Sequence, residues 1–298
     1  MPSQASKLIR ATLVNDIEAI NIPLEVQRRE WEGSATQTLL PLDSIIAPLM
    51  AEDVACERIS CSSVERDEVM FYLHGGGFTV GSCKTHRDLA ARLSLTTGIP
   101  VLLVDYRLAP EYPFPAAIED VTKAYRWLIK SGTQPHQIIM GGDSSGGGLA
   151  MSTLLSLRDN GDPLPSAVVL LSPWLDLALT GESLVSRAHL DPLVSQEGLR
   201  ACAKHYIGDR DPKDSLISPL YADLHRLPPM LIHVGDHELL LSDAIRLADR
   251  AQAANVEVKL DVWPEMWHVW HAWAASLPEG QEALNQIGGY VSRYLPQE

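Results

Sequence analysis

The chain has 298 residues, of which 46% are hydrophobic and 21% charged, with 20 glycines and 20 prolines. This composition is typical of a folded globular protein of one or two domains and excludes disorder as the main state. The 24 lysines and arginines against 38 aspartates and glutamates give a net charge of −14, so we expect neither nucleic acid nor an anionic membrane surface as a partner.

Short apolar runs alternate with longer segments of helical period, which predicts an α/β fold with a mostly parallel central sheet flanked by helices. The runs are nearly all apolar, as strands covered on both faces should be. Residues 55–63 predict antiparallel edge strands upstream. The predicted strands are 69–73, 101–104, 138–140, 167–171, 230–234 and 256–262, and the predicted helices are 86–97, 116–130, 145–160, 242–253 and 279–294.

Two stretches interrupt this alternation and predict a helical cap. The first precedes all strands and has apolar residues at the spacing of an amphipathic helix, namely Ile17, Ile20, Leu24 and Val26. The second is an insertion with a predicted helix near 196–206. Because long insertions in compact α/β domains usually form lids, we expect both pieces to pack together over the carboxyl edge of the sheet; the alternative is a surface loop with a loose N-terminal tail. The predicted organisation is cap 1–44, core 45–179, cap 180–222 and core 223–298.

A serine between glycines follows the strand at 138–140. Gly142, Ser144 and Gly146 fit G-x-S-x-G between a strand and a helix, a context that exposes the serine hydroxyl at a sharp turn. The N–H of Ser145 then points toward the reacting carbonyl. A phosphate-binding turn is the alternative, but no lysine follows the glycines and Asp143 would repel phosphate. The pattern therefore favours a nucleophilic serine.

A second glycine cluster, His74-Gly75-Gly76-Gly77-Phe78, follows the strand at 69–73. It has the H-G-G-G form that supplies further oxyanion donors in lipases and esterases. Successive glycines let backbone N–H groups approach a tetrahedral oxyanion without obstruction. A flexible connecting loop is the alternative, which the pairing with the serine turn disfavours. We predict Gly76, Gly77 and Ser145 as the oxyanion donors, with His74 orienting the loop.

On these motifs the chain resembles the bacterial hormone-sensitive-lipase-like carboxylesterases of the α/β-hydrolase superfamily. The other matching motifs are Asp105-Tyr106-Arg107-Leu108-Ala109-Pro110-Glu111, Pro115-Ala116-Ala117 with Asp120, Ser172-Pro173-Trp174, and Met266 with His268. The resemblance implies an α/β-hydrolase fold with a helical cap that hydrolyses short- to medium-chain carboxylic esters without a metal or organic cofactor. The family usually has alanine where this chain has Ser145. The departure is small because the backbone N–H, not the side chain, is the group that would bind the oxyanion.

A serine nucleophile needs a histidine base oriented by a carboxylate, and in this fold the chain order is serine, acid, histidine. His268 lies on the loop after the last predicted strand, and the resemblance places the base there because Met266 precedes it. The other histidine of this region, His271, falls where a helix is expected to begin, and its alternative role is that of a packed or solvent-facing side chain.

Three carboxylates follow the strand at 230–234 and compete for the place of the acid, namely Asp236, Glu238 and Asp243. The family usually has aspartate there, followed two residues later by leucine and further on by another acid. With Glu238 in that place, Leu240 and Asp243 match, so we prefer Glu238 although it departs from aspartate. Asp236 is the alternative, and it can instead serve as a loop residue that bonds local amides.

The resulting hypothesis is a serine carboxylesterase that works through an acyl-enzyme, with Ser144, Glu238 and His268 as its triad. Neighbours of the substrate pocket are predicted to be Phe78, Trp174 and Leu190. The expected partner is a small neutral ester, and dimers are common in the resembled family. Two other functions compete: an amidase or peptidase on the same fold, and a non-catalytic ligand-binding receptor of the same family, in which the base is usually lost.

The sequence shows neither a run of 18 apolar residues nor a secretory signal at residues 1–4, which predicts a cytoplasmic location. No cysteine pair has C-x-x-C spacing, so we expect neither a zinc site nor a disulfide framework. The predicted free thiols are Cys56, Cys61, Cys83 and Cys202.

Overall fold

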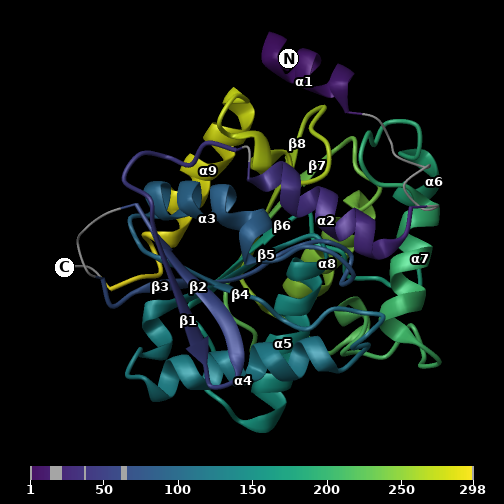
Figure 1. Ribbon diagram of the computed structural model, residues 1–298. Coiled ribbons are helices and arrows are strands. Elements are labelled where there is room, and N and C mark those ends of the chain that lie inside the picture. Colours follow the sequence, from purple (N-terminus) through teal and green to yellow (C-terminus); the bar gives the residue numbers. More distant parts are fainter. Residues whose placement is uncertain (1, 14–21, 37, 62–65, 297–298) are drawn as a thin grey trace.

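An eight-stranded sheet forms the centre of the computed structural model, which describes residues 2–13, 22–36, 38–61 and 66–296 (Figure 1). The strand order is β1-β2-β4-β3-β5-β6-β7-β8. β1 pairs antiparallel with β2, β2 pairs antiparallel with β4, and the remaining pairs are parallel. The strands are β1 (Ile45–Ala51), β2 (Val54–Ser60), β3 (Val69–Leu73), β4 (Val101–Val104), β5 (Ile138–Asp143), β6 (Ala167–Leu171), β7 (Met230–Gly235) and β8 (Val258–Trp263).

Helices cover both faces of this sheet (Figure 1). One face carries α3 (Cys83–Thr97) and α9 (Pro278–Val291), which pack on Met70 and Tyr72 of β3. The other face carries α4 (Ala116–Lys130), α5 (Ser145–Asn160) and α8 (Leu241–Ala253). There Phe71 and Leu73 of the same strand are buried, because successive side chains of a strand point to opposite faces. The predicted parallel sheet with helices on both faces is confirmed.

The predicted helices at 116–130 and 145–160 coincide with α4 and α5. The edge of the sheet was less predictable. Antiparallel strands were expected at 55–63, but the edge pair begins ten residues earlier with β1, whose side chains are mostly exposed or half-buried and which contains Pro48. Such a strand lacks the continuous apolar run that marks the central strands.

Among the described residues, four α-helices lie in the segments predicted to form a cap. They are α1 (Gln4–Thr12), α2 (Leu24–Ala35), α6 (Ser183–Ser186) and α7 (Gln196–Ile207). Of the residues that suggested an N-terminal amphipathic helix, Leu24 and Val26 lie in α2, whereas Ile17 and Ile20 lie outside the described residues. The guanidinium of Arg10 in α1 donates to the carbonyl of Leu190, so the N-terminal segment contacts the 180–222 insertion.

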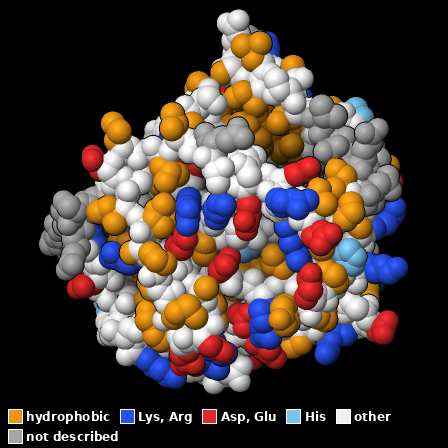
Figure 2. All heavy atoms as spheres, viewed as in Figure 1, with side chains coloured by type: hydrophobic (Ala, Val, Ile, Leu, Met, Phe, Trp, Pro, Cys, Tyr) orange, Lys and Arg blue, Asp and Glu red, His pale blue; other side chains and the backbone are white. Residues whose placement is uncertain are grey.

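Charged side chains of both signs are interspersed over the face of the molecule shown in Figure 2, so the negative net charge is not gathered into one patch there. None of the helices within the described ranges is both long enough and apolar enough to cross a membrane.

Candidate active site

Ser144 stands at a strained turn between β5 and α5. Its backbone has φ 51° and ψ −123°, a left-handed conformation that a residue with a side chain adopts only when its surroundings hold it there. Two bonds do so. The Ser144 N–H donates to the carbonyl of Leu171 at 2.9 Å, and the Ser144 carbonyl accepts the N–H of Trp174 at 2.9 Å. The turn is therefore pinned to the end of the neighbouring strand, β6.

The glycine loop after β3 lies directly against this serine. A Cβ on Gly75 would stand 3.1 Å from the Cβ of Ser144, and a Cβ on Gly146 would stand 2.1 Å from the carbonyl oxygen of Leu73. Only glycine permits both approaches. The N–H groups of Gly76 and Gly77 have no hydrogen-bond acceptor among the described residues. Two backbone donors are thus available beside the serine.

The side chain of Ser145 helps to hold this loop, a role that its backbone alone did not suggest. Its hydroxyl accepts the N–H of Phe78 at 3.3 Å. His74 supports the loop from below: its Nδ1 lies 2.8 Å from the Gly75 carbonyl oxygen, and its ring stacks on Tyr106 at 4.2 Å between centroids. Burial lowers the pKa of His74 to about 3, so the ring is neutral at physiological pH.

Asp143, the residue before Ser144, connects the serine turn to the glycine loop. Its Oδ1 accepts the hydroxyl of Tyr72 at 3.0 Å and the N–H of Gly75 at 3.2 Å, and its Oδ2 lies 3.4 Å from Nε2 of His86. Burial would raise the pKa of Asp143, but the neighbouring His86 and Tyr72 outweigh it and hold that pKa below its usual value. The buried carboxylate therefore carries a negative charge that fixes the loop.

His268 and Glu238 form a buried pair. Nδ1 of His268 lies 3.0 Å from Oε2 of Glu238, and the Glu238 side chain is fully buried. The second carboxylate oxygen accepts the N–H of Gly235 at 2.6 Å and the hydroxyl of Ser172 at 2.7 Å. Burial alone would lower the pKa of His268, but the bond to Glu238 outweighs it and raises that pKa above the usual 6.5.

The two alternative residues have other partners. Asp236 is partly exposed, accepts the N–H of Glu265 and lies 3.8 Å from the ring of His237, so the structure brings Glu238 rather than Asp236 to His268. His271 is buried in a short 3-10 helix, Trp270–Trp273, with its Nε2 3.2 Å from Nδ1 of His233. Burial holds the pKa of His271 well below its usual value, as expected for a packed histidine.

The sheet topology explains how residues so far apart in sequence meet. Ser144 follows β5 and Glu238 follows β7, while β6 pairs with both of these strands in parallel. His268 follows β8, the next strand along. Parallel neighbours end at the same edge of a sheet, so all three side chains gather at its carboxyl edge, where open α/β sheets place their sites.

Two of the three predicted pocket residues pack together. The ring of Phe78 lies 6.0 Å from that of Trp174 and stacks at 3.8 Å on Tyr206 of α7. Leu190 is half-buried on the 180–222 insertion, where its carbonyl contacts α1. Cys202, one turn before Tyr206, lies against the glycine loop, because a Cβ on Gly77 would stand 2.6 Å from the Sγ of Cys202. Helix α7 therefore borders the site. The spacing of Cys202 and Tyr206, four residues apart, puts both on one face of a helix, and this signal was available in the sequence.

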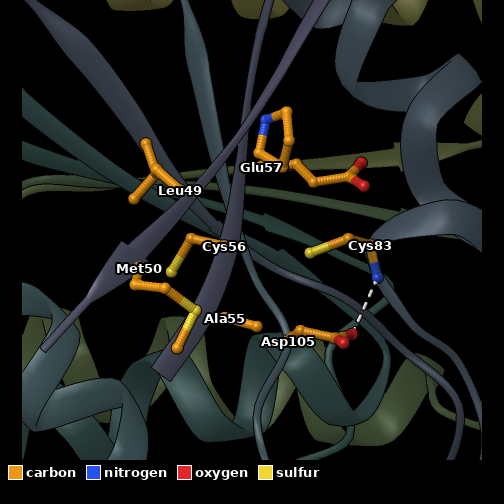
Figure 3. Close-up of a pocket in the computed structure, with 8 residues that line it drawn as sticks. Leu49, Met50, Ala55, Cys56, Glu57, Cys83 and Asp105 are labelled. Carbon is orange, nitrogen blue, oxygen red and sulfur yellow. Dashed lines mark hydrogen bonds between the residues drawn. The ribbon is translucent and has the colours of Figure 1, made fainter. Parts of the chain in front are cut away.

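A separate pocket of about 280 Å³ lies between β1, β2 and the start of α3. Figure 3 shows the residues that line it. Cys56 and Cys83 line it, and the N–H of Cys83 donates to Asp105 at 3.0 Å. Burial raises the pKa of Cys56 to about 12, so the thiol is protonated and unreactive at neutral pH. All four cysteines are free thiols, as predicted.

Comparison with known proteins agrees with this geometry. Residues 70–272 match the model of a family described as alpha/beta hydrolase fold. An acetyl-hydrolase of Streptomyces hygroscopicus is 44% identical over 222 residues, 74% of this chain and 74% of that protein. Among solved structures, an esterase from the bacterial hormone-sensitive lipase family has a TM-score of 0.94 at 41% identity and covers 99% of this chain and 100% of its own.

A second solved relative is EstE5, soaked by p-nitrophenyl butyrate, with a TM-score of 0.91 at 38% identity over 97% of this chain and 96% of its own. EstE5-PMSF, solved separately, is equally similar, with a TM-score of 0.90. The serine turn, the glycine loop and these relatives lead to one conclusion. The chain belongs to the bacterial hormone-sensitive-lipase family of the α/β-hydrolase fold, and it is a carboxylesterase, a serine hydrolase rather than a non-catalytic receptor.

Proposed function

We propose that this carboxylesterase cleaves short- to medium-chain carboxylic esters with Ser144 as nucleophile, His268 as base and Glu238 as the acid that orients the base. The observation that carries the proposal is the buried His268–Glu238 pair, which lies at the same sheet edge as the strained serine turn. A serine hydroxyl is a weak nucleophile until such a base removes its proton.

The reaction is an acyl transfer in two stages. His268 takes the Ser144 proton as Oγ attacks the ester carbonyl, and the N–H groups of Gly76, Gly77 and Ser145 stabilise the oxyanion. The tetrahedral intermediate then collapses, and His268 gives its proton to the departing alcohol. Water, deprotonated by the same histidine, attacks the acyl-enzyme, releases the carboxylic acid and restores Ser144. Glu238 stabilises the imidazolium in both stages.

The substrate range follows from the surroundings of the serine. Phe78, Trp174 and Leu190 are proposed to border the acyl group, beneath a cap made of residues 1–44 and 180–222. The contact between Arg10 and Leu190 supports the assignment of these two segments to one cap. The soak of the relative EstE5 with p-nitrophenyl butyrate, a four-carbon acyl ester, supports a short acyl site in this chain. A homodimer and a cytoplasmic location remain predictions.

The nucleophile can be tested with p-nitrophenyl butyrate. The wild-type enzyme should release a burst of p-nitrophenol equal to the enzyme concentration, and Ser144→Ala should lower kcat by about 10⁴-fold or more. Ser166→Ala is the matched control, because the Ser166 hydroxyl bonds the carbonyl of Ile138 at the opposite edge of the sheet. Full activity in Ser144→Ala would refute the assignment. With esters of increasing acyl length, kcat/KM should fall beyond the medium-chain acids.

A further inference from the structure

Ser172, in the turn after β6, occupies an unusual position beside the acid and the base. The residue is fully buried and has φ 46°, again the left-handed region. Its N–H donates to the carbonyl of His233 on β7 at 2.7 Å, which ties the turn to the next strand. A buried serine held in a strained conformation has a fixed side-chain direction, so what its hydroxyl contacts is a property of the fold.

The hydroxyl contacts Glu238 and the backbone of the residue that follows His268. Its Oγ lies 2.7 Å from Oε1 of Glu238, and it lies 3.0 Å from the backbone nitrogen of Val269, the residue after His268. The direction of both bonds is settled by chemistry, because an ionised carboxylate only accepts and a backbone N–H only donates. Ser172 therefore donates to the acid and accepts from the loop that carries the base.

We propose that Ser172 is a positioning residue of the triad, whose hydroxyl keeps Glu238 ionised and holds the His268 loop against it. This inference rests on the proposed function. A carboxylate without contact to water needs donors to stay charged, and Glu238 has three: the His268 ring, the Gly235 N–H and Ser172. Of these three donors, the Ser172 hydroxyl can be removed by a substitution that leaves His268 and the backbone of the triad loops unchanged.

The charges around the pair set the direction of the effect. Burial raises the pKa of Glu238, and the carboxylate of Asp191, which accepts the N–H of Leu239 at 2.9 Å, adds a like charge. The negative charges of Glu238, Asp191 and Asp143 all act to raise the pKa of His268. The reactive form has Glu238 ionised and His268 neutral. Without the Ser172 donor, this form is less stable relative to the forms in which the pair has taken up a proton. As the pH falls, the variant should therefore lose activity at a higher pH than the wild type does.

Ser172→Ala should therefore lower kcat for p-nitrophenyl butyrate roughly tenfold with KM unchanged, because a lost hydrogen bond to a charged group weakens the transition state by about that factor. The acid limb of its kcat/KM profile should move upward by about half a pH unit or more. The matched control is Ser218→Ala: Ser218 is equally buried and also makes one accepted and one donated bond, to Leu177 and Pro212. The control should keep the wild-type limb.

Ser172→Gly serves as the second variant, because glycine adopts φ 46° without strain and still lacks the hydroxyl. Both Ser172 variants should share the shifted limb. If both variants keep the wild-type kcat and the wild-type acid limb, the inference is wrong. It is also wrong if both lower the urea midpoint of unfolding while Ser218→Ala does not, because Ser172 then has only a structural role. Failure of the wild type to hydrolyse the ester would instead refute the proposed function.

Discussion

At the residue scale, the acid of the pair departs from the aspartate that is usual in the family. Glu238 has one more methylene, and its carboxylate folds back onto its own turn to accept the N–H of Gly235. The turn is tight, since a Cβ on Gly235 would stand 2.0 Å from the carbonyl oxygen of Met266. The loop that carries His268 thus passes directly over the end of β7, and the longer side chain reaches the ring from inside the turn.

This arrangement predicts different results for the two nearby carboxylates. Glu238→Gln should lower kcat by about 10⁴-fold, because the amide neither fixes the imidazole tautomer nor stabilises the imidazolium. Asp236→Asn should stay within about twofold of the wild type, since Asp236 is partly exposed and an asparagine oxygen can still accept the N–H of Glu265. Steady-state kinetics on p-nitrophenyl butyrate measure both. A larger loss of kcat in Asp236→Asn than in Glu238→Gln would show that Asp236 is the acid of the triad.

At the scale of elements, α2 is clamped to the glycine loop by one arginine. Nε of Arg28 donates to the carbonyl of Thr79 at 2.7 Å, and Nη2 donates to the carbonyl of Ala109 at 2.8 Å. Two more bonds join the guanidinium to both oxygens of Glu111. Since an arginine fork holds planar partners in a defined direction, α2 and the glycine loop with its proposed oxyanion donors are expected to keep one relative position.

Loss of the clamp should therefore reach the chemistry. We expect Arg28→Ala to lower kcat roughly tenfold, since displaced oxyanion donors stabilise the transition state less. Arg126→Ala is the control, because Arg126 makes a similar paired contact with Asp162 away from the site. The comparison uses kcat on one ester together with urea midpoints. Equal kcat in the two variants would show that α2 does not support the loop.

The same elements show what the sequence could predict. The serine turn and the glycine loop were predictable because each is a short motif of neighbouring residues, glycines around a serine in one and glycines after a histidine in the other. Ser172 appeared only as part of a motif, and its partner Glu238 lies 66 residues away, a separation that no local pattern reveals. Helix α1 was predicted only as part of the cap segment 1–44, because its nine residues are fewer than the window over which a helical period becomes clear.

At the scale of the whole molecule, α1 joins parts of the chain that are far apart in sequence. The hydroxyl of Ser3 donates to Glu279 of α9 at 2.9 Å. Arg10 binds the carbonyl of Leu190, and Ile9 packs on the cluster formed by Met266, Trp267 and Trp270 around the His268 loop. The N-terminal helix thus contacts α9, the 180–222 insertion and the loop that carries the proposed base, His268.

If α1 is an integral part of the fold, its two faces should respond differently to truncation. Ile9→Ala should lower the free energy of unfolding by about 1 kcal/mol, less than the cost at a fully buried site because Ile9 is only partly buried. Leu8→Ala, at the neighbouring residue that is 63% exposed, should change it by less than about 0.5 kcal/mol. Urea denaturation followed by tryptophan fluorescence measures both, since the tryptophans of the cluster lie under Ile9. Equal midpoints for the two variants would mean that α1 is peripheral, and the His268 loop would then owe its position to the core alone.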